Sequence, residues 1–387
     1  MNGAAAFSAR FAECFGGSAG NAPVICWAPG RVNLIGDHVD YCGGPVLPMP
    51  IQFGTTVGVR LTEGGRVRGA SVNRADIADF RLGGGSAVPD GSWGRFLSGA
   101  IAVLAAEGIP VAGADVLVSG DIPGSGLSSS ASLSVALLYA LTSAAGCTMA
   151  PLSLALAAQR IEHEHVGVQC GLMDQSVIVL GEPDSALLFD CFDHRHRSIV
   201  IDDPAVCVIV VDTCRTRQLV DSAYNARLGE TRVAAAALGV GHDSLARLDV
   251  ATFQARGPTI EDEVVYRRAR HVVSETARVA QAASALEAND WTALGNLFSQ
   301  SHASLRDDFE VSCPELDTLA DALASQQGCY GARMTGAGFG GSVVALADAS
   351  HADRVVKNAA TTYTNRFAIA PRWFVARSLG GVRSLDG

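Results

Sequence analysis

The sequence has few charged residues, and it is poor in basic ones. Only 18% of its 387 residues are charged, and 29 lysines and arginines against 39 aspartates and glutamates give a formal net charge of -10. An acidic chain disfavours nucleic acid and anionic membranes as bulk partners, although backbone amides and a few arginines suffice to bind a nucleotide. A hydrophobic fraction of 48% excludes a disordered chain and indicates a well-buried globular protein.

Cysteine pairs, export signals and long apolar runs are also lacking. The ten cysteines are scattered without any Cys-x-x-Cys pair, which disfavours a zinc site or a disulfide framework and favours reduced thiols. The first residues lack a basic segment followed by an apolar run, and no stretch of about 18 uninterrupted apolar residues occurs. We therefore expect a cytoplasmic protein with a small molecule as its partner, and neither nucleic acid nor a membrane.

What the sequence does contain is a glycine- and serine-rich turn at 120–132. It follows a strand predicted at 114–118 and precedes an apolar helix predicted at 133–144. Such a turn leaves unpaired backbone N–H groups at the positive end of a helix dipole, which is typical of a phosphate site. It matches neither the Walker loop nor Gly-x-Gly-x-x-Gly. Taken alone, the segment is equally compatible with a flexible surface turn.

A second segment concentrates charge. Arg31, Asp37, His38 and Asp40 fall within ten residues, among apolar and glycine positions. One interpretation is a salt-bridged turn in which the two aspartates neutralise Arg31. The other is a polar pocket for a polyhydroxylated ligand, because carboxylates and imidazole exchange hydrogen bonds with hydroxyl groups.

Two further carboxylates are candidates for chemistry. Glu162 lies on a helix predicted at 151–165, in a His- and Glu-rich run without the His-Glu-x-x-His spacing of zinc proteases. One carboxylate facing a phosphate loop suits Mg²⁺, and we select Glu162. Asp174 lies among glycine and apolar residues and needs a partner, for which Arg31 is the natural candidate. A helix cap is the alternative for Asp174.

The remaining pattern predicts a mixture of helices and strands. Trp93 opens a helix that ends near Leu104, and we favour core packing over contact with an adenine for its ring. Glycines at 336–341 precede a strand at 343–346 and predict a turn that closes against another loop. The other predicted elements are a helix at 7–15, a strand at 22–28, paired strands at 46–62, a glycine-rich loop at 84–91, strands at 185–191 and 198–212 around a hairpin tip at 193–197, and helices at 216–238, 267–288 and 291–306.

Three motifs together resemble the galactokinase branch of the GHMP small-molecule kinases. They are Gly-Arg-Val-Asn-Leu-Ile-Gly-Asp-His-Val-Asp-Tyr at 30–41, Gly-Leu-Ser-Ser-Ser-Ala-Ser at 126–132 and Arg-Met-Thr-Gly-Ala-Gly-Phe-Gly-Gly at 333–341. Similar stretches at 170–175, 222–227 and 307–319 extend the likeness over nearly the whole chain. The resemblance implies an α+β fold of two domains, 1–198 and 199–387, with helices packed on mixed sheets and the active site in the cleft between them.

The resemblance also implies a reaction, the transfer of the γ-phosphate of ATP to the C1 hydroxyl of D-galactose with Mg²⁺. Asp174 is then the catalytic carboxylate that accepts the hydroxyl proton, beside Arg31, while amides and Mg²⁺ stabilise the transferring phosphoryl group. Ser130 and Glu162 correspond to the metal site. The implied sugar contacts are Asp37, His38, Asp40, Gly171 and Tyr224. The implied nucleotide contacts are Gly124, Ser125, Gly126, Leu127, Ser128, Ser129, Ser130, Ala131 and Ser132.

Three departures from the family pattern keep other functions open. Asp37 stands where the family usually has Glu, Val39 and Cys42 replace residues of the usual Thr-Asp-Tyr-Asn, and the loop from Pro123 to Gly126 is one residue short. The alternatives are a 1-kinase of N-acetylgalactosamine, galactosamine or arabinose, and a non-catalytic sensor of sugar and ATP. We expect a monomer or a weak homo-oligomer.

Overall fold

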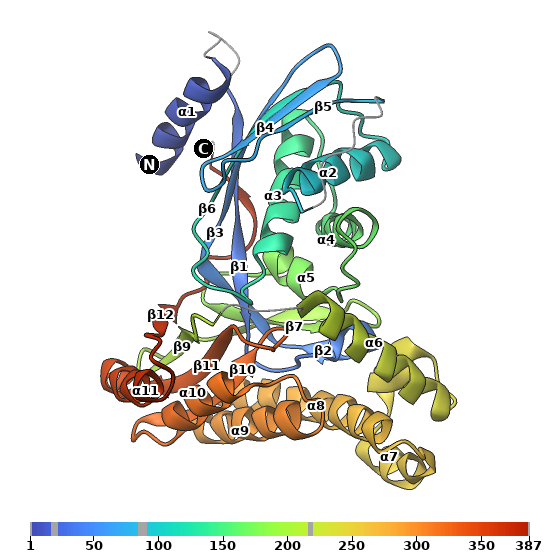
Figure 1. Ribbon diagram of the computed structural model, residues 1–387, viewed down its shortest axis with the longest axis vertical. Helices are drawn as coiled ribbons and strands as arrows, with labels where there is room; N and C mark the ends of the chain where they lie inside the picture. The colour runs from blue at the N-terminus through green and yellow to red at the C-terminus, as the bar shows by residue number, and fades with distance from the viewer. Residues whose placement is uncertain (1, 17–21, 84–90, 216–219, 386–387) are drawn as a thin grey trace.

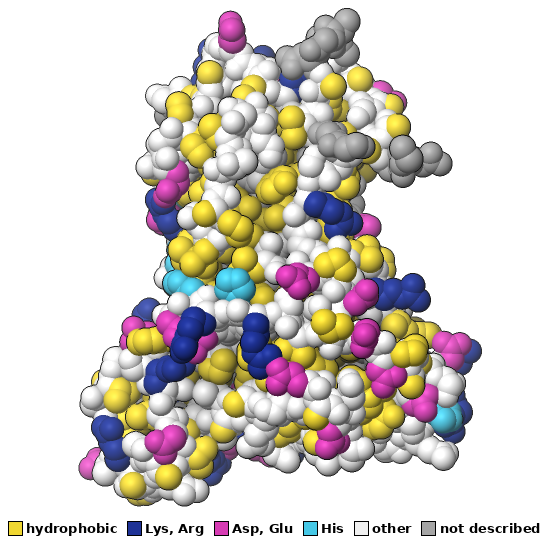
Figure 2. Space-filling view, turned by 180° about the vertical axis from the view of Figure 1, so that it is seen from behind, with side chains coloured by type: hydrophobic (Ala, Val, Ile, Leu, Met, Phe, Trp, Pro, Cys, Tyr) yellow, Lys and Arg dark blue, Asp and Glu magenta, His cyan; other side chains and the backbone are white. Residues whose placement is uncertain are grey.

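The computed structural model describes residues 2–16, 22–83, 91–215 and 220–385, without the side chains of 2, 3 and 220–222. In Figure 1 a tall upper part built on long strands stands on a broader lower part crossed by long helices. Figure 2 shows the molecule from behind, where the lower part is again the broader one. Acidic and basic side chains are intermixed over this lower part. Among the described residues no helix is both long and apolar enough to span a membrane.

The upper part is a mixed sheet with helices on both faces. Its strand order is β13-β1-β3-β6-β4-β5, antiparallel throughout except for the β4–β6 pair. Helices α2 to α5 cover one face and α1 lies on the other (Figure 1). The strands are β1 (Val24–Asn33), β3 (Pro48–Leu61), β4 (Arg66–Ser71), β5 (Ala78–Arg81), β6 (Ala114–Gly120) and β13 (Arg383–Ser384). The helices are α1 (Asn2–Phe15), α2 (Gly94–Ala106), α3 (Ser129–Ala144), α4 (Pro151–Arg160) and α5 (Met173–Leu180).

The lower part contains an antiparallel sheet of order β10-β11-β9-β12 and a small sheet of order β2-β7-β8. The strands are β2 (Pro45–Val46), β7 (Ser185–Asp190), β8 (His196–Val200), β9 (Val206–Asp212), β10 (Cys329–Thr335), β11 (Ser342–Asp348) and β12 (Arg372–Ala376). The helices are α6 (Val220–Ala237), α7 (Val250–Arg256), α8 (Glu263–Glu287), α9 (Trp291–Asp307), α10 (Pro314–Ala324) and α11 (Ala352–Phe367). Short helical turns are η1 (Asp40–Cys42), η2 (Ile161–Val166), η3 (His242–Arg247) and η4 (Gly257–Thr259).

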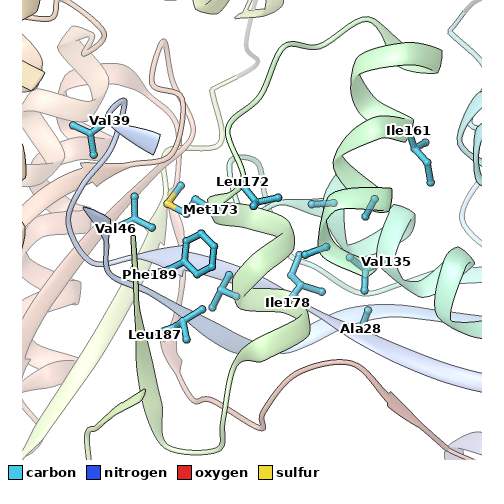
Figure 3. Close-up of a cluster of buried hydrophobic side chains, with 14 of the residues drawn as sticks. Ala28, Val39, Val46, Val135, Ile161, Leu172, Met173, Ile178, Leu187 and Phe189 are labelled. Carbon is cyan, nitrogen blue, oxygen red and sulfur yellow. The ribbon is translucent and has the colours of Figure 1, made fainter. Parts of the chain in front are cut away.

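Buried apolar side chains fix the helices that border the site. Figure 3 shows Val135 of α3 and Ile178 of α5 packing together near Ala28 of β1. Leu172 and Met173 join the same cluster with Phe189 of β7. Because apolar contacts hold α5 on three sides, its first turn has a fixed position relative to β1 and α3.

The structure confirms most predicted elements and corrects three. The helix beginning after Trp93, the strand at 114–118 and the helices at 267–288 and 291–306 are present with slightly shifted ends. The prediction of paired strands at 46–62 is wrong, because β3 runs unbroken and pairs with β1 and β6 instead of folding back. The strand predicted at 198–212 is interrupted between β8 and β9. The helix predicted at 151–165 is α-helical only to Arg160.

Two predicted segments lie partly outside the described residues. These are the glycine-rich loop at 84–91, of which only Gly91 is described, and the first residues of the helix predicted at 216–238.

Candidate active site

A cavity of about 240 Å³ joins the upper and lower parts of the molecule. Ser128, Glu162 and Asp174 come from the upper part, and Tyr224 and Gly336 come from the lower part. The predicted site residues that line it are Arg31, Asp37, His38, Asp40, Gly126, Ser128, Ser129, Ser130, Glu162, Gly171, Asp174 and Tyr224. Segments far apart in the sequence therefore meet in one polar cavity.

Asp174 and Arg31 form a bidentate ion pair in the cavity. Nε of Arg31 donates to Oδ1 of Asp174 at 2.8 Å, and Nη2 donates to Oδ2 at 2.9 Å. The third nitrogen of the guanidinium, Nη1, donates to the carbonyl oxygen of Gly126 at 2.6 Å. A planar guanidinium fits a carboxylate in this way, so it fixes both the position and the plane of the Asp174 carboxylate. Asp174 lies in the first turn of α5, and the N-cap residue of this helix is Leu172. The alternative that Asp174 caps the helix is therefore wrong.

The serine-rich loop reaches the cavity at the beginning of α3. Gly124 and Gly126 have positive φ angles of 83° and 87°, and Ser128 lies in the left-handed region at 60°. The side chains of Leu127, Ala131 and Ser132 are buried, and Ser132 donates to the carbonyl of Ala28 on β1. Because these three side chains are buried, only the backbone of these residues is available to a ligand. The first turn of a helix presents free N–H groups, which are suited to phosphate.

The second glycine cluster closes over this loop, which confirms the predicted role of residues 336–341. A Cβ on Gly336, where φ is 81°, would lie 2.9 Å from the carbonyl oxygen of Gly126. Directly after the cluster, Ser342 at the beginning of β11 donates to the carbonyl oxygen of Ser125 at 3.1 Å. The close approach of the two backbones therefore requires glycine at 336.

Glu162 reaches the cavity from a π-helical turn. Residues Ile161–Val166 continue α4 with a wider turn, a feature that often occurs at functional sites. Its carboxylate is 4% exposed and accepts a hydrogen bond from Nε2 of Gln175 at 2.7 Å. Burial, with the charge of Asp174, raises the pKa of Glu162 to about 7. Among the described residues, no group of three or more histidine, cysteine or acidic side chains could hold a metal ion.

Asp37 is paired with an arginine other than the one expected. The interpretation that Asp37 neutralises Arg31 is wrong, because Arg333 of β10 forms the ion pair with Asp37. The backbone N–H of Gly336 donates to its other oxygen at 2.9 Å. Both carboxylate oxygens of Asp37 thus hold partners from the lower part of the molecule, and burial raises its pKa despite Arg333.

His38 has neighbours at both ring nitrogens. Nε2 lies 3.2 Å from the carbonyl oxygen of Ala337, and Nδ1 lies 3.0 Å from the hydroxyl of Tyr41. Burial, and next the neighbouring His271, lower the pKa of His38 to about 3, so the ring is neutral. A carbonyl only accepts, so Nε2 carries the proton and Nδ1 accepts from Tyr41. The ring lies 5.5 Å from that of Tyr224.

Asp40 and Gly171 lie against each other. A Cβ on Gly171 would be 2.0 Å from Oδ2 of Asp40, so no larger residue fits there without displacing this carboxylate. Burial, together with the charges of Asp174 and Asp37, raises the pKa of Asp40 to about 7. An uncharged Asp40 would be both a donor and an acceptor, which suits a ligand rich in hydroxyl groups.

The sequence analysis missed the residues of α8 that hold the loop around Asp37. Glu275, fully buried, accepts from the N–H of Gly36 at 3.0 Å, and Nε2 of His271 lies 3.1 Å from the carbonyl oxygen of Asp37. Arg278 and Arg333 lower the pKa of Glu275 to about 2, although burial is the largest influence and acts in the opposite direction. No local signal marks this pair, because Arg268 and Arg278 lie on the same face of α8 and make it polar along its length.

A second cavity of about 540 Å³ adjoins the first and shares Ser129 and Ser130 with it. Trp93 lines it, yet its ring is 5% exposed and its Nε1 donates to the carbonyl of Asp76 at 2.9 Å. The packing role predicted for Trp93 is therefore confirmed, and one edge of the ring still forms part of the cavity wall.

Matches to models of protein families assign this chain to a class of enzymes. The galactokinase galactose-binding signature matches residues 9–61, and the N-terminal and C-terminal domains of the GHMP kinases match 95–182 and 282–365. Together with the fold, these matches define a small-molecule kinase of the GHMP class.

Similar proteins whose names are known narrow this class of enzymes to one family. A galactokinase of Roseiflexus sp. is 41% identical over 364 residues, covering 93% of this chain and 92% of the relative. One from Halalkalibacterium halodurans is 37% identical over 381 residues, covering 97% and 96%. The crystal structure of Lactococcus lactis galactokinase complexed with galactose superposes with a TM-score of 0.95 at 35% identity, over 99% of this chain and 100% of that one. The chain belongs to the galactokinase family, and the α+β fold implied by the resemblance is confirmed.

Proposed function

We propose that this protein is an ATP-dependent sugar kinase that transfers the γ-phosphate of ATP to the C1 hydroxyl of D-galactose, giving galactose 1-phosphate. The observation that carries the proposal is the position of the Arg31–Asp174 pair, which borders the same cavity as the beginning of α3. A carboxylate beside a phosphate-binding helix end is the arrangement that phosphoryl transfer to a hydroxyl group needs. The name of the relatives and the galactose in the Lactococcus lactis structure support this sugar.

In the proposed reaction, Asp174 accepts the proton of the sugar hydroxyl. Arg31 and the backbone N–H groups at the beginning of α3 stabilise the negative charge that develops on the phosphoryl group. Asp40 and Tyr224 contribute polar atoms for the remaining hydroxyl groups, and Gly171 leaves Asp40 the space to do so. Because both nitrogens of His38 hold protein partners, and Asp37 is 1% exposed with a partner on each oxygen, we assign these two residues to the shape of the pocket.

The cavity also fits a magnesium ion. A carboxylate buried in this way, with a raised pKa, gains from a nearby cation, and Mg²⁺ needs only one or two protein oxygens beside phosphates and water. Ser130 and Glu162 would hold it, and the bound ion would neutralise phosphate charge. The second cavity extends from Ser129 and Ser130 to Trp93 and has room for the adenosine of ATP.

The first experiment is a sugar panel. We expect ADP release with galactose to exceed that with N-acetylgalactosamine, galactosamine and arabinose by at least tenfold in kcat/KM. Galactose turnover no better than that of the other sugars would exclude a galactose-specific enzyme and favour one of the related 1-kinases. Binding of sugar and ATP without any ADP release would favour a sensor.

The second experiment is Asp174→Asn, which keeps the shape of the side chain and removes the base. We expect kcat to fall by about 10²-fold or more while galactose binding, measured by calorimetry, is retained. Turnover near the wild-type rate with unchanged binding would show that Asp174 is not the proton acceptor.

We also propose a division into domains at 198/199. One sheet supports a boundary near this point, because the strands of the β10-β11-β9-β12 sheet all come from the second half. The division is not complete, since β8 spans residues 198 and 199 and β13 returns to pair with β1. The cytoplasm as the compartment, and a monomer or weak homo-oligomer as the assembly, stay predictions.

A further inference from the structure

Ser128 differs from the other serines of the loop in the direction of its hydroxyl. It lies immediately before α3 with φ 60° and ψ 45°, a left-handed conformation that residues with a Cβ rarely adopt. Its side chain is 8% exposed, and its Oγ donates a hydrogen bond to Oδ2 of Asp174. Unfavourable backbone conformations persist where the surrounding structure imposes them, often at functional sites.

The contacts to Asp174 come from two sources. Nε and Nη2 of Arg31 both lie 2.8 Å from Oδ1, and Nη2 also donates to Oδ2 at 2.9 Å. Oδ2 accepts a second hydrogen bond, from the hydroxyl of Ser128. Among the described residues, Ser128 is therefore the donor that holds the Asp174 carboxylate besides its arginine partner.

The loop that holds Ser128 also holds Arg31. The carbonyl of Gly126 accepts from the Arg31 side chain at 2.6 Å, and the carbonyl of Leu127 accepts from its backbone N–H at 3.1 Å. Three consecutive loop residues thus contact either Asp174 or its arginine partner. A hydroxyl anchored at this point fixes the carboxylate from the side opposite to α5.

We propose that Ser128 is a positioning residue for the base: its hydroxyl holds Oδ2 of Asp174 and, together with Arg31, fixes the carboxylate in the orientation that takes the proton of the sugar. The inference rests on the proposed function. The sugar oxygen forms a bond to the γ-phosphorus, the bond from that phosphorus to the bridging oxygen breaks with its electron pair on ADP, and the hydroxyl proton moves to the Asp174 carboxylate. The side chain of Ser128 therefore acts on Asp174 and not on the nucleotide, in contrast to the role expected from the sequence.

The test compares Ser128→Ala with Ser128→Gly. Both remove the hydroxyl, but glycine adopts a positive φ without strain. We expect kcat to fall by about tenfold in both variants, with the KM values for galactose and ATP within about twofold of wild type. A role confined to the shape of the loop predicts wild-type kcat in Ser128→Gly, and that result would overturn the proposal. Ser143→Ala, at the other end of α3, is the control and should leave kcat unchanged.

A double-mutant cycle with Asp174→Asn separates this proposal from the proposed function. If Ser128 acts through Asp174, Ser128→Ala has no further effect on the residual activity of Asp174→Asn. Multiplied losses, or a raised KM for ATP in Ser128→Ala alone, would overturn the positioning role. Wild-type turnover in Asp174→Asn would instead exclude Asp174 as the base, whatever Ser128→Ala does.

Discussion

Two arginine–carboxylate pairs lie on the two sides of the cavity, and they differ in what surrounds them. Arg31 and Asp174 have side-chain exposures of 6% and 24%, whereas Arg333 and Asp37 have 0% and 2%. Asp174 is therefore the more exposed of the two carboxylates, and it lies beside the beginning of α3 in the cavity. Asp37 has partners on both oxygens, and Arg333 also donates to the carbonyl of Leu34 at 2.8 Å.

The difference separates the pair to which we assign a role in the proposed reaction from one that joins two parts of the fold. Arg333 belongs to β10 and Asp37 to the loop after β1, so their contact joins the lower and upper parts of the molecule beside the sugar side of the cavity. A fully buried pair of this kind contributes through geometry, since losing one partner leaves the other charge uncompensated. Loss of one partner from a more exposed pair costs less stability, because water reaches the remaining charge.

The largest expected effect comes from breaking the buried pair. Arg333→Leu leaves Asp37 buried without its cation, whereas Glu275 keeps Arg278, and we expect the free energy of unfolding to fall by about 3–5 kcal/mol. Arg31→Leu should cost only about 1–3 kcal/mol in stability, because water reaches Asp174, but lower kcat by about 10²-fold. Urea unfolding and steady-state kinetics on both variants measure this contrast. Equal loss of stability in the two variants would contradict it.

The two ion pairs also differ in how well the sequence predicts them. Arg31–Asp174 was predicted because Asp174 lies among apolar neighbours and needs a partner, and because both residues fall in recognisable motifs. Arg333–Asp37 was missed, since the two residues are 296 positions apart and Asp37 had a nearer alternative in Arg31. Glu275 lies in an ordinary helical pattern, and only the three-dimensional fold brings it to Gly36.

Secondary structure was predictable where the local pattern and the tertiary contacts agree. The strand before the serine-rich loop and the helix after it form as expected because both are buried on the sheet side. The long β3 was misread because the prolines and glycines within it suggest turns, whereas its pairing with β1 and β6 overrides that local preference. The π-helical turn that carries Glu162 has no sequence signal that we recognised.

Gly171→Ala should have a smaller effect, confined to the sugar side. The added Cβ would lie 2.0 Å from Oδ2 of Asp40, so this carboxylate must move. We expect the KM for galactose to rise about tenfold, kcat and the KM for ATP to change little, and stability to fall by about 1–3 kcal/mol. Kinetics with each substrate varied in turn measure the pattern. A rise in the KM for ATP instead of galactose would remove Asp40 and Gly171 from the sugar side of the cavity.

The smallest effect concerns Glu162, a buried carboxylate whose partner is an amide instead of an arginine. Its pKa is raised from 4.5 to about 7, so the folded protein binds a proton that the unfolded chain has released between these values. The stability that this proton contributes is present below pH 4.5 and is lost as the pH rises towards 7 and beyond.

Glu162→Gln keeps the hydrogen bond from Gln175 and removes the titration. We expect the variant to gain stability relative to wild type as the pH rises from 5 to 8 in the absence of ligands, by an amount on the order of 1 kcal/mol. Glu164→Gln is a matched control two residues along, because Arg160 lowers the pKa of Glu164 whereas burial raises that of Glu162. Thermal unfolding across this range should give a curve parallel to wild type for the control. A parallel curve for Glu162→Gln as well would mean that Glu162 is already ionised in the ligand-free protein, and its burial would then need a cation to compensate it.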